Sequence, residues 1–240
     1  MTSTPRRPES PDEEILSAEW PDVRTELTDP ERVERIGREL TRAFELLADV
    51  RDGITVFGSA RTGPGSPEYE AARELSRRLA AEAGATVITG GGPGVMEAAN
   101  RGAQEGGGCA VGLLIDLPFE TGSNGYLDLE VPFHYFFTRK VSFVRYSNAF
   151  VAMPGGYGTL DELFEVLCLV QTKKIRRYPV VLYGTAFWGG LVAWLRERLL
   201  ADGLISPGDE ELFVVTDDMD EIVAICTDAC RRQHAYRGVE

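Results

Sequence analysis

Short apolar segments alternate with longer segments of helical periodicity from Gly53 almost to the end of the chain, and this alternation constrains the fold most. The apolar segments lack a polar–apolar alternation, which is typical of strands buried on both faces of a parallel sheet. The expected fold class is therefore α/β, a Rossmann-like doubly wound parallel sheet with helices on both faces. The sequence predicts strands at 54–58, 86–89, 109–115, 129–136, 149–153, 180–183 and 213–215, and helices at 68–83, 94–105, 139–147, 159–171, 187–200 and 219–230.

The rest of the chain is expected to be peripheral to one domain at 51–230. Residues 31–50 are predicted to form an N-terminal helix, because apolar residues recur there at three- and four-residue spacing after Asp29-Pro30. Residues 1–30 are polar and rich in Pro and Glu, so we expect a disordered or loosely docked tail. Residues 231–240 are expected to be a flexible C-terminus.

Charge and composition exclude several classes of partner. The formal net charge is −13, so the surface should repel nucleic acid and anionic lipid. No apolar run approaches the roughly 20 residues of a membrane helix, and no signal segment follows Met1, so a cytoplasmic protein is expected. The cysteines are expected to be reduced thiols. Cys226, Cys230 and His234 are spaced four residues apart, but a fourth ligand is lacking, so no metal site is predicted.

Two glycine-rich loops each follow a predicted strand and open a predicted helix, at Thr89–Gly94 and at Pro154–Thr159. Glycine lets the backbone approach a ligand closely, and a helix N-terminus attracts anions, so the two loops predict a phosphate site at one edge of the sheet. The dinucleotide fingerprint fails, because Val95 stands where its third glycine should be. Asp116 lies near the spacing of a ribose-binding acid, so NAD binding stays open as an alternative.

Charged residues are expected near these loops. Arg139 and Lys140 follow the strand predicted at 129–136, and a guanidinium there could bind phosphate through two hydrogen bonds or lie solvated on the surface. Asp161, Glu162 and Glu165 lie in the first two turns of the helix that follows the second glycine loop. These carboxylates could merely interact favourably with the positive end of the helix dipole, or they could reach a ribose attached to the bound phosphate. The sequence contains no G-x-S-x-G elbow and no complete metal motif.

Together these segments resemble the LOG family of phosphoribohydrolases. Pro154 to Glu162 match its P-G-G-x-G-T-x-x-E motif, and Arg139-Lys140 precede Pro154 by fifteen residues, as the family's R-K pair does. Gly90 to Asn100 resemble its other glycine loop, and Val56 to Arg61 resemble its first strand and loop. The similarity extends from about residue 50 to 228, which is most of the chain.

The resemblance implies a homodimeric phosphoribohydrolase with no cofactor and a nucleotide-binding catalytic domain at 51–230. Such an enzyme cleaves the N-glycosidic bond of a nucleoside 5′-monophosphate, AMP or a cytokinin riboside monophosphate, to free base and ribose 5-phosphate. The alternative is a non-catalytic carrier of a nucleotide or cofactor phosphate on the same fold. Residue by residue, the resemblance implies Arg139 and Glu162 as the catalytic pair, and it implies substrate-binding roles for Gly58, Ser59, Arg61, Gly91, Gly92, Met96, Lys140, Gly155, Gly156, Gly158, Thr159 and Glu165.

Members of this family have also been labelled lysine decarboxylases. That chemistry normally needs pyridoxal phosphate bound to a lysine. None of the three lysines, Lys140, Lys173 and Lys174, lies in a recognisable cofactor motif, so we reject that activity for this chain. The aromatic stretch at 134–137 and the N-terminal extension depart from the compact plant type, and they leave the preferred base open.

Overall fold

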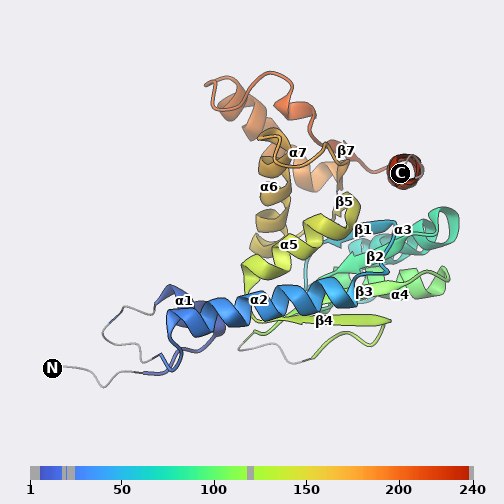
Figure 1. Ribbon diagram of the computed structural model, residues 1–240. Helices are drawn as coiled ribbons and strands as arrows, with labels where there is room; N and C mark the ends of the chain where they lie inside the picture. Colours follow the sequence, from blue (N-terminus) through green and yellow to red (C-terminus); the bar gives the residue numbers. More distant parts are fainter. Residues whose placement is uncertain (1–5, 18–19, 21–24, 118–121, 238–240) are drawn as a thin grey trace.

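The computed structural model describes residues 6–17, 20, 25–117 and 122–237. Within them, one sheet of seven strands runs in the order β4-β3-β2-β1-β5-β6-β7, and every neighbouring pair is parallel (Figure 1). The expected α/β class is confirmed. The strands are β1 (Gly53–Phe57), β2 (Thr86–Thr89), β3 (Ala110–Ile115), β4 (Leu129–Phe133), β5 (Ser147–Ala152), β6 (Val180–Tyr183) and β7 (Val214–Thr216).

Helices cover both faces of the sheet and form two separate apolar cores. One face packs against α3 (Pro67–Ala83), α4 (Val95–Glu105) and α8 (Met219–Arg237). The other packs against α2 (Asp29–Leu46), α5 (Phe136–Tyr146), α6 (Tyr157–Gln171) and α7 (Thr185–Trp194). Figure 1 shows α2, α5 and α6 on the side of the sheet away from α3 and α4. The remaining turns are α1 (Pro11–Leu16), a π-helical turn at Leu195–Leu200 and a 3-10 turn at Asp209–Glu211.

The sheet is wound outward in two directions from its centre. The chain adds β2, β3 and β4 on one side of β1, and then returns to add β5, β6 and β7 on the other side. Ligands of such sheets bind in the crevice outside the carboxyl ends of the strands where the order reverses. The boundary between β1 and β5 is therefore the place to search for a site. Both strands lie in the middle of the sheet and are buried along their whole length, so the loops that follow them start from well-packed strands.

Several element boundaries differ from the sequence expectation. The strand predicted at 129–136 ends at Phe133, and the helix predicted at 139–147 already begins at Phe136. The ladder stops at Phe133 because this residue pairs with Ile115, the last residue of β3. Arg139 therefore lies inside α5 rather than at its first residue. Helix α8 also continues beyond 230, to Arg237.

The N-terminal region contains a short helix. Residues 11–16, expected within a disordered or loosely docked tail, form α1, whose Ser10 side chain accepts a hydrogen bond from the Glu13 N–H. Glu14 of α1 is buried, and its carboxylate lies 2.9 Å from the guanidinium of Arg35 on α2. In the part of the chain that the structure describes, no helix is long and apolar enough to cross a membrane.

Candidate functional site

The loops that follow β1, β2 and β5 are hydrogen-bonded to one another at the switch point. The Ser59 N–H donates to the Pro154 carbonyl oxygen at 3.1 Å, and the Ser59 carbonyl accepts from the Val95 N–H at 2.9 Å. Ser59 therefore links the second glycine loop to the start of α4, which the first glycine loop opens. The two glycine loops and the loop after β1 form one continuous backbone surface at the carboxyl edge of the sheet.

Arg139 lies against the first glycine loop. Its Nε donates to the Leu113 carbonyl oxygen at 2.7 Å, and one terminal nitrogen donates to the Gly90 carbonyl oxygen at 3.4 Å. A Cβ on Gly90 would lie 2.2 Å from this guanidinium and 2.7 Å from the sulfur of Met96. The structure thus brings together Arg139, Gly90 and Met96, with the guanidinium held by one carbonyl within β3 and one directly after β2.

Lys140 is surrounded by the three carboxylates of α6. Its Nζ lies 2.7 Å from Glu165, 3.0 Å from Asp161 and 3.2 Å from Glu162. Burial by itself would lower the pKa of Lys140, but these carboxylates outweigh burial and hold that pKa above its ordinary value. Lys140 is therefore a charged partner of the acidic cluster. The substrate-binding role that the resemblance implies for Lys140 stays a prediction.

Glu162 is the most buried of the three carboxylates, with 8% of its surface exposed. Burial raises the pKa of Glu162, and the Glu165 carboxylate adds to the rise. Lys140 opposes this rise in the pKa of Glu162 most strongly, and Arg139 opposes it less. Lys140 therefore does more than Arg139 to favour the ionised form of Glu162. A buried carboxylate of raised pKa beside two cations is typical of groups that exchange protons during catalysis.

The glycines of the site divide into two kinds. A Cβ on Gly58 would lie 2.4 Å from Val95, and one on Gly155 would lie 2.1 Å from the Thr159 hydroxyl, so packing within the protein explains both. A Cβ on Gly156 or Gly158 would meet nothing within 4 Å. Gly158 also lies in the first turn of α6, where the N–H groups lack intrahelical acceptors. The open space at Gly156 and Gly158 is where an anion could approach these amides.

An asparagine that the sequence reasoning did not single out holds the first glycine loop. The Asn124 backbone N–H donates to the Gly91 carbonyl at 2.8 Å, and its side-chain amide donates to the Gly92 carbonyl and to Asn100, both at 3.0 Å. Asn100 in turn accepts from the Thr89 hydroxyl at 2.6 Å. Asn124 lies in the loop at 116–128, which follows β3 at the same edge, but no motif marks it.

The remaining predicted residues lie at the margin of the site. Arg61 is exposed, and its backbone N–H donates to the Ser59 hydroxyl at 3.1 Å. A shallow hollow of about 610 Å³ opens beside the acidic cluster and is lined by Lys140, Tyr157, Leu160, Asp161, Phe164 and Glu165. Tyr157 is 92% exposed there.

Cys226, Cys230 and His234 of α8 make contacts that differ from those of metal ligands. Cys226 and Cys230 are buried, and His234 Nε2 lies 2.8 Å from a carboxylate oxygen of Asp52. Burial raises the pKa of Cys226 to about 12 and that of Cys230 to about 11. Among the residues that the structure describes, no group of three or more His, Cys, Asp or Glu side chains could hold a metal ion.

Fold and site together define a Rossmann-like α/β protein in which one lysine faces three carboxylates, one of them buried, at the carboxyl edge of the sheet. A family model described as "Possible lysine decarboxylase" matches residues 96–226. The chain belongs to this family, whose curated members are named for LOG phosphoribohydrolase activity.

Two curated relatives illustrate the similarity. The probable cytokinin riboside 5′-monophosphate phosphoribohydrolase LOGL9 of Oryza sativa subsp. japonica is 33% identical over 175 residues, which cover 71% of this chain and 75% of the relative. The cytokinin riboside 5′-monophosphate phosphoribohydrolase of Rhodococcoides fascians is 28% identical, and the match covers 71% of this chain and 87% of the relative.

Two solved structures share the fold. The X-ray structure of TM1055, a structural-genomics target, is 29% identical, with a TM-score of 0.54, and the match covers 72% of this chain and 96% of that one. The molybdenum cofactor carrier protein of Chlamydomonas reinhardtii is 25% identical, with a TM-score of 0.55, and the match covers 75% and 98%. The fold therefore occurs both in named hydrolases and in a named carrier.

Proposed function

We propose that this protein is a phosphoribohydrolase that converts a nucleoside 5′-monophosphate to free base and ribose 5-phosphate. In this reaction water adds to C1′ of the ribose and the C1′–N bond breaks. The base leaves with the bonding electron pair and takes up a proton. The substrate class is AMP or a cytokinin riboside monophosphate, which is the substrate named for the curated relatives.

The buried carboxylate of Glu162 carries this proposal. It lies one turn beyond the glycine loop at 154–158, so a phosphate bound at the start of α6 would place the attached ribose beside it. Positive charge develops on the sugar ring as a glycosidic bond breaks, and a nearby carboxylate stabilises that charge. Glu162 would also orient or deprotonate the attacking water, a role suited to a carboxylate whose pKa is raised by burial.

Arg139 and the glycine loops have binding roles in this proposal. Arg139 would hold the phosphate, since a guanidinium presents paired donors to phosphate oxygens. The amides of Gly156 and Gly158 would add donors at the positive end of α6. Lys140 would keep Glu162 ionised for its work as a base. Gly58 and Gly155 would serve the site indirectly, by allowing the loops to pack closely.

The proposal is tested by incubating purified protein with a panel of nucleoside 5′-monophosphates and separating the products by chromatography. The matching nucleosides, which lack phosphate, are the substrate controls. Glu162→Gln should fold and bind but lose most turnover, roughly 100-fold or more, the scale of general acid–base contributions. Glu197→Gln, at an exposed site on the π-helical turn, is the matched variant and should keep full activity. Full activity in Glu162→Gln would remove Glu162 from the mechanism.

A second candidate function is that of a carrier for a cofactor phosphate, because a named molybdenum cofactor carrier shares the fold. A carrier would use the same glycine loops to bind its cargo without breaking a bond. If no monophosphate in the panel, an isopentenyladenosine monophosphate included, yields free base, the carrier function is preferred. The retention of both Arg139 and Glu162 at one edge favours catalysis, because an anion binder gains nothing from a buried acid beside its ligand.

We also propose that the protein forms a homodimer through α5 and α6. Their outward faces expose several large apolar side chains, and Tyr157 and Phe164 among them line the hollow beside Lys140. Exposed apolar side chains grouped on one face mark association surfaces. The exposed members are Phe136, Phe137, Val141, Tyr157 and Phe164.

A further inference from the structure

Helix α5 carries Arg139 and Lys140, yet its own first turn does not cap it. Its N-cap residue Tyr135 makes no side-chain capping hydrogen bond, and no acidic residue lies in its first turn. The first N–H groups of any helix lack intrahelical acceptors and need partners from elsewhere. Of these N–H groups, that of Phe136 donates to Asp12 of α1, and side chains of α2 bind the residues around the helix start. Both α1 and α2 lie outside the residues that the family model matches.

Glu39 of α2 binds both ends of the junction between β4 and α5. One carboxylate oxygen accepts from the His134 backbone N–H at 2.8 Å and lies 2.8 Å from His134 Nδ1. The other contacts the hydroxyl of Thr138, the residue that precedes Arg139. The Glu39 side chain is only 5% exposed and Thr138 is fully buried, so water does not replace these bonds.

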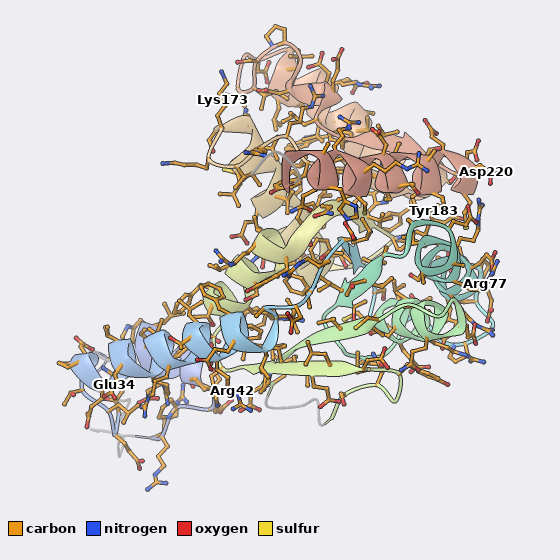
Figure 2. The ribbon with its side chains drawn as sticks, turned by 45° about the vertical axis from the view of Figure 1, so that its right-hand side comes forward. Glu34, Arg42, Arg77, Lys173, Tyr183 and Asp220 are labelled. Atoms are coloured by element: carbon orange, nitrogen blue, oxygen red, sulfur yellow. The ribbon has the colours of Figure 1, made fainter. Side chains whose placement is uncertain are left out.

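Two further side chains hold the same five-residue stretch. Asp12 of α1 accepts from the Phe136 N–H at 3.4 Å. Arg35 of α2 donates from Nε to the hydroxyl of the buried Tyr135 at 2.7 Å, and its guanidinium also pairs with Glu14 of α1. Figure 1 shows α2 lying along α5 and β4, and Figure 2 labels Glu34 and Arg42 on the same helix, both exposed.

We propose that Glu39 is a positioning residue for Arg139 and Lys140. It fixes the start of α5, and so holds the guanidinium against Gly90 and the ammonium among the α6 carboxylates. Hydrogen bonds to a charged acceptor are roughly twice as strong as neutral ones, so one buried carboxylate suffices to set this register. A displacement of about 1 Å in a catalytic group can cost on the order of 100-fold in rate. The activity readout of this inference rests on the proposed function.

The test compares Glu39→Ala and Glu39→Gln with Glu45→Gln, an exposed glutamate on the same helix. The parameters kcat and KM for AMP are measured well below the unfolding temperature. Affinity for ribose 5-phosphate is measured by calorimetry. Glu39→Ala should lower kcat about ten-fold or more and weaken ribose 5-phosphate binding. Glu39→Gln keeps the volume and one acceptor oxygen, so its losses should be intermediate. Glu45→Gln should match the wild type.

The same Glu39 substitution, made in a variant of the protein, separates a positioning role from a general loss of stability. With Arg139→Lys and Lys140→Met both present, Glu39→Gln should cause little further loss of kcat, because its effect passes through these two side chains. Losses that multiply would overturn the proposal, as would normal kcat and KM in folded Glu39→Ala. If Glu39→Ala does not fold, Glu39→Gln decides by the same readouts.

Failure of the proposed function can be told apart from failure of this inference. If the wild type releases no base from any monophosphate, the phosphoribohydrolase assignment fails, and positioning is judged from ribose 5-phosphate affinity alone. Weaker binding in the Glu39 variants, with unchanged binding in Glu45→Gln, would still support it. Unchanged binding in the Glu39 variants would overturn it. A wild type that neither releases base nor binds ribose 5-phosphate would overturn both proposals.

Discussion

The ammonium group of Lys140 faces three carboxylates, and this arrangement sets the proton affinity of Glu162. A single cation cannot neutralise three anions, and the four groups are held in place by their attachment to α5 and α6. Lys140 is the largest influence that favours the ionised form of Glu162, and burial is the largest influence against it. The pH at which Glu162 takes up a proton therefore depends on Lys140 more than on Arg139.

A pH profile of Lys140→Met tests this balance. Without the ammonium, the pKa of Glu162 should rise further, so activity that requires ionised Glu162 should fall off at a higher pH than in the wild type. The acid limb of kcat/KM, measured by base release, should move upward in pH. Arg139→Gln should move it less and should raise KM.

Lys174→Met, at an exposed lysine, is the control for Lys140→Met and should leave the profile unchanged. An acid limb that stays in place in Lys140→Met, or moves downward, would contradict the role given to Lys140. The wild-type profile should itself show an acid limb above the ordinary pKa range of glutamate, because burial raises the pKa of Glu162.

The first turn of helix α6 contains a glycine that the stability of the helix does not require. Gly158 lies in the first turn, a Cβ there would meet nothing within 4 Å, and alanine is favoured over glycine inside helices by about 1 kcal/mol. A residue that costs stability without a packing reason indicates that something outside the chain approaches it. In the proposed function this is the phosphate of the substrate.

Gly158→Ala should therefore separate stability from binding. We expect unchanged or higher unfolding free energy, by up to about 1 kcal/mol, together with a KM for the monophosphate raised about ten-fold or more. Chemical denaturation and steady-state kinetics measure the two effects. Gly63→Ala, another position where a Cβ meets nothing within 4 Å, is the control and should leave KM unchanged. An unaltered KM in Gly158→Ala would remove this glycine from the phosphate site.

At the scale of the whole molecule, the sequence predicted more of the sheet than of the site. The seven strands were predictable because each is a short apolar run bounded by glycine, proline or a helical segment. The position of Glu162 was also predictable, because the second glycine loop marks the start of the helix in which it lies. The Lys140 cluster was not, because its partners lie on a different helix and helix-to-helix distances are not written in local periodicity. The polar composition of residues 1–30 favoured a tail, whereas Asp12 accepts from the Phe136 N–H and Glu14 pairs with Arg35 of α2. Glu39 lies in the helix predicted at 31–50, but its contacts with His134 and Thr138 are not written in local periodicity.

Association of the whole molecule can be tested at one exposed side chain. Val141 is 46% exposed on the outer face of α5, so Val141→Glu should place a charge in the proposed dimer interface without disturbing the core. Light scattering after size exclusion should show a dimer for the wild type and a monomer for the variant, with circular dichroism unchanged. Val33→Glu, at an exposed position of α2, is the control and should remain dimeric. A wild-type monomer would refute the dimer outright.

The two ends of the sheet are closed to further growth. The outermost strand β4 carries an exposed glutamate, Glu130, and a proline, Pro132, which has no N–H to donate to another strand. At the opposite end, β7 is only three residues long. Short, charged or proline-containing end strands resist edge-to-edge pairing between molecules. Copies of this protein should therefore meet through helices rather than by extending their sheets, and concentrated samples should resist the strand-pairing route to fibrils.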